Sequence, residues 1–542
     1  MIDRSPIAAP YPHYMAFAPL DAWARVLVGE REFKGRDIPP RFWLRLAGAL
    51  ATSVLGTLLT LPERLLLAPV LRWRGAASGY VVDRPALVVL GYFRSGTTHL
   101  QYLLTCDPNF ATPKWHQALA PQGWILSWIF LRLFLVPFMG GKRPMDDVEY
   151  GPDWPTEDDF AANNWAAASG LIGKMVYTSP EQYERFRRYH FLRGLSGGQL
   201  RRWQRAMWAF LWKFSKVVGE RGLLLKSPSH TARACEVAAL FPPGKAKFIH
   251  IGRSPLAVVR SNLTMHHRHH THQMQEPASD DTLRERIARE YLDTEAAFDE
   301  AATKLPPGTL ARVRFEDLRA DPIGQLKRCY AELDLPWTDA FERNLVTYLR
   351  TVEGYKPATS EKAGDERPLS VARELEALST RRGHHAPPVP KQALPAPASP
   401  PSTASTSRRI ALASTLAFLI GAATWIATAN LLGSHQNWFV WPAGVLIGGW
   451  LIRVAKVGST RLGALAAALT LALTVAVAFP NTRTINYRVN PHPPEPVKFF
   501  PEVWDTSIKQ LTKNSTIFWA FMGTLTAYRF ASRRYVSPFG KS

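Results

Sequence analysis

A run of aliphatic residues at positions 86–90 (ALVVL) is followed at once by a glycine-containing segment, GYFRSGTT, at positions 91–98. The two glycines have the GxxxxG spacing of a P-loop. In such a loop, backbone N–H groups and the N-terminal dipole of the following helix bind an anionic phosphate. We therefore predict a strand, a phosphate-binding loop and a helix over residues 99–104. An ordinary glycine turn between a strand and a helix is the alternative.

The loop lacks the lysine of an ATP site. In a Walker A loop the residue after the second glycine is a lysine that reaches the β- and γ-phosphates. Here that residue is Thr97, and the basic residue of the loop is Arg94, which stands three positions earlier. The sequence therefore predicts a phosphate site that differs from an ATP site.

Three further apolar runs, at residues 223–225, 247–251 and 311–314, each precede a helix-like stretch. Strands that alternate with helices are typical of an α/β fold with a parallel sheet, in which ligands bind at the carboxyl ends of the strands. Lys226 follows the first of these runs and Arg253 follows the second. Ser261 lies about two helical turns after Arg253, so its hydroxyl can add a donor on the same side as the guanidinium.

The charge of the chain favours anionic partners. Its 542 residues carry a formal net charge of +22, which favours nucleotides, sulfated or phosphorylated substrates, or anionic lipid surfaces. We find no helix-turn-helix, zinc-finger or RNP signature, so nucleic acid is not an expected partner. The three cysteines form no CxxC pair and cannot build a disulfide framework, which favours a reducing compartment.

Composition divides the chain into four parts: an N-terminal helical, membrane-interfacial segment (1–80), a soluble domain (81–380), a Pro/Ala/Ser-rich linker (381–408) and a transmembrane region (409–542). Residues 410–432 are nearly uncharged and exceed the about 20 residues that a bilayer requires. Residues 438–452, 462–479 and 515–528 are further candidates, so we expect about four helices. A buried helical core is the alternative. Lys and Arg in alternate loops predict a multi-pass protein with its soluble domain in the cytoplasm.

Two apolar segments within the first 140 residues are ambiguous. Residues 41–75 contain Arg45 and the sequence Pro62-Glu63-Arg64, which we expect to break a clean span. An interfacial amphipathic helix and a core helix of the soluble domain both fit this segment. Residues 122–140 carry Arg132 in their middle and raise the same ambiguity, and we assign them to the acceptor side of the domain.

Taken together, the loop, the lysine after residues 223–225 and the Arg253–Ser261 pair resemble the sulfotransferases that use 3′-phosphoadenosine 5′-phosphosulfate (PAPS). The resemblance runs from about residue 87 to residue 356. The segments KRPMD (142–146) and PTEDDF (155–160) look like the bacterial branch that resembles tyrosylprotein sulfotransferases. The resemblance implies a P-loop-type parallel sheet flanked by helices, with PAPS as the sulfonate donor and no metal ion.

The resemblance also implies roles for individual residues. Arg94 would stabilise the leaving phosphate and the transferring sulfonyl group, and Lys226 would contact the sulfonyl oxygens. Arg253 and Ser261 match the site for the 3′-phosphate. The residues that would bind the 5′-phosphosulfate are Arg94, Ser95, Gly96, Thr97 and Thr98.

The acceptor hydroxyl must lose a proton, so a general base is required. His116 and His230 are the leading candidates as catalytic bases, nearly level with each other, and Glu157 is the third. His230 can instead cap a helix that begins at Thr231, and Glu157 can instead form a structural salt bridge. The histidine-rich run at residues 266–272 contains no cysteine or carboxylate, so we expect no metal site there.

We expect transfer of a sulfonate to a hydroxyl of a lipid, a glycan or another small acceptor near a membrane. Sulfonate transfer is an in-line displacement that spreads negative charge over equatorial oxygens, so cationic side chains and positioning carry the catalysis. A P-loop kinase or NTPase is the rival enzyme. A non-catalytic, membrane-anchored nucleotide-binding protein is the rival from another class. The sequence leaves the acceptor and the oligomeric state open.

Overall fold

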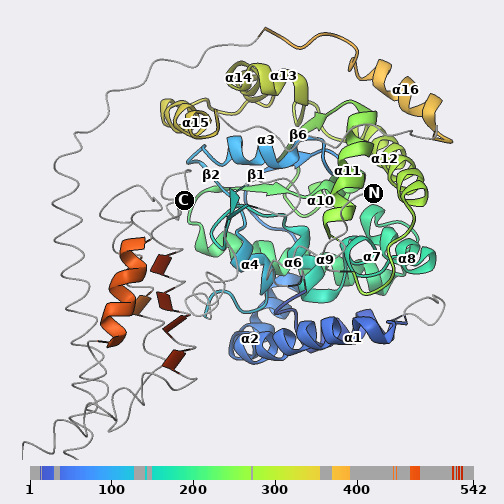
Figure 1. Cartoon of the computed structure of the whole chain (residues 1–542). Helices are drawn as coiled ribbons and strands as arrows, with labels where there is room; N and C mark the ends of the chain where they lie inside the picture. Colours follow the sequence, from blue (N-terminus) through green and yellow to red (C-terminus); the bar gives the residue numbers. More distant parts are fainter. Residues whose placement is uncertain are drawn as a thin grey trace, which may run out of the picture. The chain divides into compact units, whose positions relative to one another are not determined.

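The computed structural model describes residues 13, 15–29, 37–126, 141–142, 149–269, 273–353, 369–390, 464–475 and a few positions between 443 and 528. The chain divides into two compact units. The first comprises Met1–Leu131, Lys142–Pro395 and Phe539–Ser542, and it contains every strand and helix shown with a label in Figure 1.

A five-stranded parallel sheet forms the centre of this unit. Its strands are β1 (Ala86–Leu90), β2 (Phe110–Ala111), β5 (Gly222–Lys226), β6 (Ala246–Gly252) and β7 (Leu310–Arg314), in the order β2-β5-β1-β6-β7. Every residue of β1 and β5 is buried, as expected for strands covered on both faces. The predicted α/β fold with a parallel sheet is therefore confirmed, and all four predicted strands are present.

Helices flank the sheet on both sides (Figure 1), with α3, α13, α14 and α15 on one side and α4, α6 and α9 on the other. The helices are α1 (Leu20–Val28), α2 (Trp43–Ala77), α3 (Thr97–Leu104), α4 (Trp115–Leu119), α6 (Asp159–Ala166), α7 (Leu171–Met175), α8 (Pro180–Phe191), α9 (Gly197–Val217), α10 (Ala234–Ala238), α11 (Pro255–His269), α12 (Asp280–Ala302), α13 (Phe315–Ala320), α14 (Pro322–Glu332), α15 (Asp339–Val352) and α16 (Ala372–Arg381). Two 3-10 helices, η1 (Pro40–Phe42) and η2 (Pro228–Arg233), and a small β3–β4 sheet (Gly141–Lys142, Glu149–Tyr150) complete the elements.

Alternate residues of the central strands build the main hydrophobic core. Leu87 and Val89 of β1 join this cluster, as do Ile249 and Ile251 of β6, because side chains two residues apart point to the same face of a sheet. Buried residues of α3, α14 and α15 complete it. The core therefore fixes the strand that precedes the phosphate loop against the helix that follows it.

The loop between β1 and α3 needs its glycines. Gly91 and Gly96 have φ values of +144° and +103°, and a side chain at Gly96 would overlap the ring of Phe315. Arg94 also has a positive φ, of +67°, which is uncommon for a residue with a Cβ. The amide of Gly91 donates to Thr231 Oγ1 at 2.7 Å, which connects the start of the loop to η2.

Residues 43–75 of the first ambiguous segment lie in one continuous helix, α2, so the expectation of a break at Pro62-Glu63-Arg64 was wrong. α2 contains both Pro62 and Pro69 in its interior. Glu63 lies inside the protein, where it forms an ion pair with the buried Lys213 of α9 and accepts the amides of Ile125 and Leu126 at 2.9 and 2.8 Å. Proline inside a helix removes a backbone hydrogen bond and usually ends or kinks the helix. Here the contacts of Glu63 hold the middle of α2 in place.

The predicted transmembrane spans lie largely outside the described residues, as do most of the linker and residues 127–140 of the second ambiguous segment. Within the part of the chain that the structure describes, one helical stretch, Pro40–Ala77, is long and apolar enough to cross a membrane. Ala464–Val475 is a shorter apolar helix. The number of spans and their orientation therefore remain predictions.

Replacing Gly96 by alanine should destabilise the domain more than the same change at Gly308. Gly308 also has a positive φ, of +71°, but no atom lies within 4 Å of the position its Cβ would take. The left-handed conformation should cost Gly308→Ala about 1–2 kcal/mol. Gly96→Ala should cost about 1–3 kcal/mol more, because the methyl group overlaps Phe315. Urea unfolding of the two full-length variants measures the difference, and equal midpoints would contradict the described loop geometry.

Candidate functional site

Three of the residues proposed from the sequence meet around the phosphate loop. Arg94 Nε donates to Ser261 Oγ at 3.0 Å, and the guanidinium of Arg253 donates to the carbonyl of Arg94 at 3.0 Å. Asn262, next to Ser261 on α11, donates to the carbonyl of Phe93 at 2.8 Å. The loop is therefore held by the end of β6 and the first turns of α11.

The two arginines create a local excess of positive charge. Burial and the neighbouring Arg94 guanidinium lower the pKa of Arg253 below its ordinary value. The ring of Phe315 lies 4.7 Å from the guanidinium carbon and covers part of it. A phosphate dianion between these cations would relieve their repulsion and accept charge-assisted hydrogen bonds, so this end of the loop suits an anionic group.

Lys226 ends β5, next to the loop. The parallel pairing sets Lys226 beside Val89, two residues before the first glycine of the loop. Its Nζ lies 2.7 Å from Glu157 Oε1 and 3.4 Å from Thr98 Oγ1, which belongs to the first turn of α3. The lysine side chain is 2% exposed and that of Glu157 is 18% exposed, so the carboxylate is the more accessible partner of the pair.

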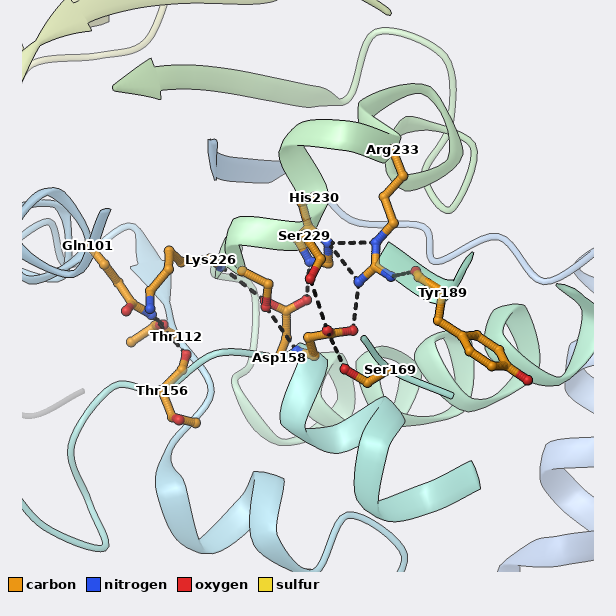
Figure 2. Close-up of polar contacts among 12 residues, drawn as sticks. Gln101, Thr112, Thr156, Asp158, Ser169, Tyr189, Lys226, Ser229, His230 and Arg233 are labelled. Atoms are coloured by element: carbon orange, nitrogen blue, oxygen red, sulfur yellow. Dashed lines mark hydrogen bonds and ion pairs between the residues drawn. The ribbon is translucent and has the colours of Figure 1, made fainter. Parts of the chain in front are cut away.

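Asp158 fixes this region to the end of β5. Its carboxylate accepts the amide of Lys226 at 3.1 Å and the hydroxyl of Ser227 at 3.2 Å, and its other oxygen contacts His230 Nε2 (Figure 2). Burial would raise the pKa of Asp158, but His230 and Arg233 more than offset that effect and hold the pKa below its usual range. The carboxylate is therefore a charged structural anchor.

Asp159 has a different set of partners. It forms an ion pair with the fully buried Arg233 at 2.6 Å and accepts the hydroxyl of Ser169 at 2.7 Å. Arg233 also donates to the carbonyl of Tyr189 at 2.7 Å, as Figure 2 shows. The three consecutive carboxylates thus serve two purposes: Asp158 and Asp159 hold the chain in place, and Glu157 contacts the lysine at the loop.

The two histidines proposed as bases lie in different surroundings. His230 has no exposed surface; Nε2 contacts Asp158, and Nδ1 lies 3.4 Å from Arg233 Nε. It stands inside η2, so the alternative role as a cap of a helix starting at Thr231 does not apply. His116 is 6% exposed, and its Nδ1 lies 2.9 Å from the carbonyl of Pro152 and 3.5 Å from Asp153 Oδ1.

Gln101 is a site residue that the sequence analysis missed. It lies on α3, and its amide nitrogen donates to Thr112 Oγ1 and to the carbonyl of Thr156, both at 3.0 Å (Figure 2). It therefore connects the helix after the phosphate loop to the residue before Glu157. The available signal was a polar residue one turn after Thr97, among the buried Leu100, Tyr102, Leu103 and Leu104 of the same helix.

A second buried network supports the loop from behind. Glu290 of α12 forms an ion pair with Lys174 and accepts the hydroxyl of Tyr92 at 3.0 Å. Burial would raise the pKa of Glu290, but Lys174 and neighbouring donors lower it well below its ordinary value. Lys174 Nζ also lies 4.0 Å from the centre of the Phe93 ring. The two aromatic residues of the loop therefore rest on a fixed charge pair.

The histidine-rich run forms part of α11, and residues 270–272 of it lie outside the described residues. His267 Nε2 lies 2.8 Å from Asp280 Oδ1. No group of three or more His, Cys, Asp or Glu side chains is arranged to hold a metal ion in the ranges for which side chains are described.

Comparisons with known proteins agree with the motifs. Residues 85–339 match the model of the sulfotransferase family. The chain is 30% identical, over 280 residues, to omega-hydroxy-beta-dihydromenaquinone-9 sulfotransferase Stf3 of Mycobacterium tuberculosis and of Mycobacterium bovis, covering 51% of this chain and 69% of each relative. Among solved structures, sulfotransferase STF9 from Mycobacterium avium is 19% identical with a TM-score of 0.49, over 66% of this chain and 88% of that one.

Acidification should destabilise the domain through His190, a fully buried residue behind the loop. Burial lowers the pKa of His190 from 6.5 to about 3. The charge of Glu290 opposes this shift, and the charges of Lys174 and Arg233 add to it. The unfolded chain therefore takes up a proton at a pH where the folded chain does not. Stability should fall by roughly 1.4 kcal/mol per pH unit below about pH 6, down to about pH 3.

The variant His190→Gln keeps a donor for Thr294, whose hydroxyl lies 3.0 Å from His190 Nε2, and should reduce this slope by one proton. His385→Gln is the control, because the His385 side chain is 57% exposed. Chemical unfolding between pH 4 and pH 7 measures both variants, and an unchanged slope in His190→Gln would refute the assignment.

Proposed function

The chain belongs to the sulfotransferase family, and we propose that it transfers a sulfonate group from PAPS to a hydroxyl of a lipid or glycan acceptor. The observation that carries this proposal is the meeting of Arg94, Arg253 and Ser261 at a phosphate loop without a Walker lysine. No metal ion is required by this assignment.

The residues present fit PAPS as the donor. Arg253 and Ser261 would hold the 3′-phosphate, which a guanidinium fork and a hydroxyl can bind together. The loop backbone, with the side chains of Ser95, Thr97 and Thr98, would hold the 5′-phosphosulfate at the N-terminus of α3. Gly96 allows the backbone to approach that group, because it has no side chain to obstruct it.

Arg94 and Lys226 are the proposed catalytic cations. During transfer, the bond from sulfur to the acceptor oxygen forms while the bond from sulfur to the bridging oxygen of the 5′-phosphate breaks. Negative charge then collects on the sulfonyl oxygens and on the departing phosphate oxygen. Lys226 is buried beside Thr98, where a low dielectric strengthens its attraction to those oxygens. Arg94 would stabilise the departing phosphate.

We propose Glu157 as the general base that takes the acceptor proton. It contacts Lys226 and keeps part of its surface accessible, whereas both ring nitrogens of His230 face buried partners. His116 remains the alternative base. Because Lys226 and Glu157 lie side by side, the lysine would contact the sulfonyl oxygens while the neighbouring carboxylate contacts the attacking hydroxyl.

A membrane lipid is the proposed acceptor class. The name of the relative from Mycobacterium tuberculosis describes a hydroxylated menaquinone as its acceptor. The apolar runs after residue 409, with the arginines at 408 and 409, support a multi-pass anchor and a cytoplasmic catalytic domain.

Mass spectrometry of lipid extracts from cells with and without the protein tests the function: a sulfated lipid should appear only with the protein. An unchanged lipid profile together with ATP turnover would support the rival NTPase.

Loss of Arg253 should weaken binding selectively. The variant Arg253→Gln should reduce affinity for adenosine 3′,5′-bisphosphate about 10–100-fold, because it removes a charge-assisted hydrogen bond worth about 1.5–3 kcal/mol. Affinity for adenosine 5′-monophosphate, which has no 3′-phosphate, should change far less. Ser261→Ala should show the same selectivity with a smaller loss. Calorimetric titration of the full chain measures all four affinities, and equal losses for both nucleotides would assign these residues to another phosphate.

Removing the Glu157 carboxylate should impair catalysis and spare donor binding. Glu157→Gln should lower kcat by about 10²–10⁴, the usual contribution of a general base. The affinity for adenosine 3′,5′-bisphosphate should stay close to that of the parent. Transfer of sulfur-35 from labelled PAPS to a total lipid extract measures turnover. Glu220→Gln is the matched control, because the Glu220 side chain is 97% exposed. A larger loss in His116→Gln than in Glu157→Gln would assign the base to His116.

A further inference from the structure

The helix α2 carries its small and polar residues on the side that faces the protein. Its buried positions include Ala49, Ser53, Gly56, Thr60 and Glu63, which repeat every three or four residues and so form one helical face. A side chain at position 56 would overlap the backbone of the residue at position 17, so the helix packs closely there. A surface helix of a water-soluble domain is expected to have the opposite arrangement, with its apolar side toward the protein and its polar side toward water.

The opposite side of α2 is apolar and exposed. Only 22% of the residues in its most apolar stretch are buried. Its outward side chains include Leu44, Val54, Leu58, Leu61, Leu65 and Leu66, with exposed fractions between 41% and 86%. A contiguous patch of this kind is rare on a soluble monomer and marks a surface that binds something apolar.

Charge is absent from the middle of this face. Between residues 46 and 71 the only ionisable residues are Glu63 and Arg64. Glu63 is buried against Lys213, and Arg64 turns back to Asp21 of α1, with 3.3 Å between the charged atoms. The apolar face therefore presents no charge that a protein partner would have to match.

Both ends of α2 carry arginine together with an exposed tryptophan. Arg41 and Trp43 stand at its start, and Trp73 lies between Arg72 and Arg74 at its end. The two tryptophans are 60% and 64% exposed. Tryptophan and arginine beside an apolar stretch are typical of the boundary between lipid tails and headgroups, where guanidinium groups contact phosphates.

The helix is attached to the domain along its length, which determines how it can meet a membrane. It packs on α1 and α9, and near its middle Thr57 Oγ1 accepts the amide of Leu20 at 3.1 Å. Residues 45–72 span about 40 Å, more than the about 30 Å of a hydrocarbon core. Crossing the bilayer would carry the polar side of the domain into lipid, so the helix can only lie flat on the bilayer.

We propose that the outward face of α2 docks the domain on a lipid bilayer, with its leucines in the acyl region and its terminal arginines on headgroup phosphates. A second copy of the chain fits this face poorly. Arg41 pairs with Glu276 at 2.9 Å, but Arg45 near the start and Arg72 and Arg74 at the end keep arginine at both ends of the helix. Pairing two α2 helices in either direction therefore sets arginine against arginine. Attachment of the domain to the bilayer through α2 does not depend on the sulfonate transfer proposed above.

The test measures the environment of α2 in the full chain, since apolar segments beyond residue 409 could hold the protein on vesicles by themselves. Spin labels are attached at Leu58→Cys and Leu65→Cys in a Cys235→Ser background, because the other two cysteines are buried. Leu256→Cys on α11, far from α2 in Figure 1, is the matched control: Leu256 is apolar and 48% exposed. The protein is incorporated into vesicles of phosphatidylcholine and phosphatidylglycerol.

Oxygen dissolves in lipid tails and a charged nickel chelate does not. We expect the ratio of oxygen to chelate collision rates to be about tenfold higher at positions 58 and 65 than at position 256. Ratios equal to that of the control would overturn the proposal. Labels shielded from both reagents would overturn it too, because another part of the chain or a second copy would then cover the face. Neither collision rate depends on transfer activity, so this test is independent of the proposed function.

Discussion

The buried carboxylate of Asp158 connects the two halves of the site. It accepts the amide of Lys226 and the hydroxyl of Ser227 from the end of β5, and it pairs with His230 inside η2. Burying the carboxylate without these donors would cost folding free energy. The segment that carries Asp158 is therefore stable in this position only when the donors from β5 and η2 are in place. Together with Asp159 and Gln101, this anchor holds Glu157 beside the lysine.

The sheet brings the second half of the site to the same edge. The carboxyl ends of parallel strands lie at one edge of a sheet. Lys226 at the end of β5, the loop after β1 and Arg253 after β6 therefore converge. Lys226 and the loop meet there although more than a hundred residues separate them in the sequence. Behind the loop, the Lys174–Glu290 pair supports Tyr92 and Phe93. A rigid scaffold of this kind suits a reaction that relies on positioning and on cations already in place.

Much of this arrangement could be predicted from the sequence, because the signals were local. The GxxxxG loop, the strand before it and the basic residues after the other strands follow rules that act over a few residues. The roles of Asp158 and Asp159 could not be found that way, since their partners at the end of β5 and in η2 lie about 70 residues further along the chain. The sequence Pro62-Glu63-Arg64 predicted a break, but tertiary contacts of Glu63 outweigh that local preference.

The central claim is that the loop at residues 91–98, together with Arg253 and Ser261, selects a nucleotide with a 3′-phosphate instead of a nucleoside triphosphate. Titrating the full chain with adenosine 3′,5′-bisphosphate and, separately, with ATP and magnesium tests it most directly. We expect the bisphosphate to bind at least about tenfold more tightly, a difference of about 1.4 kcal/mol. Equal or tighter binding of ATP would contradict it.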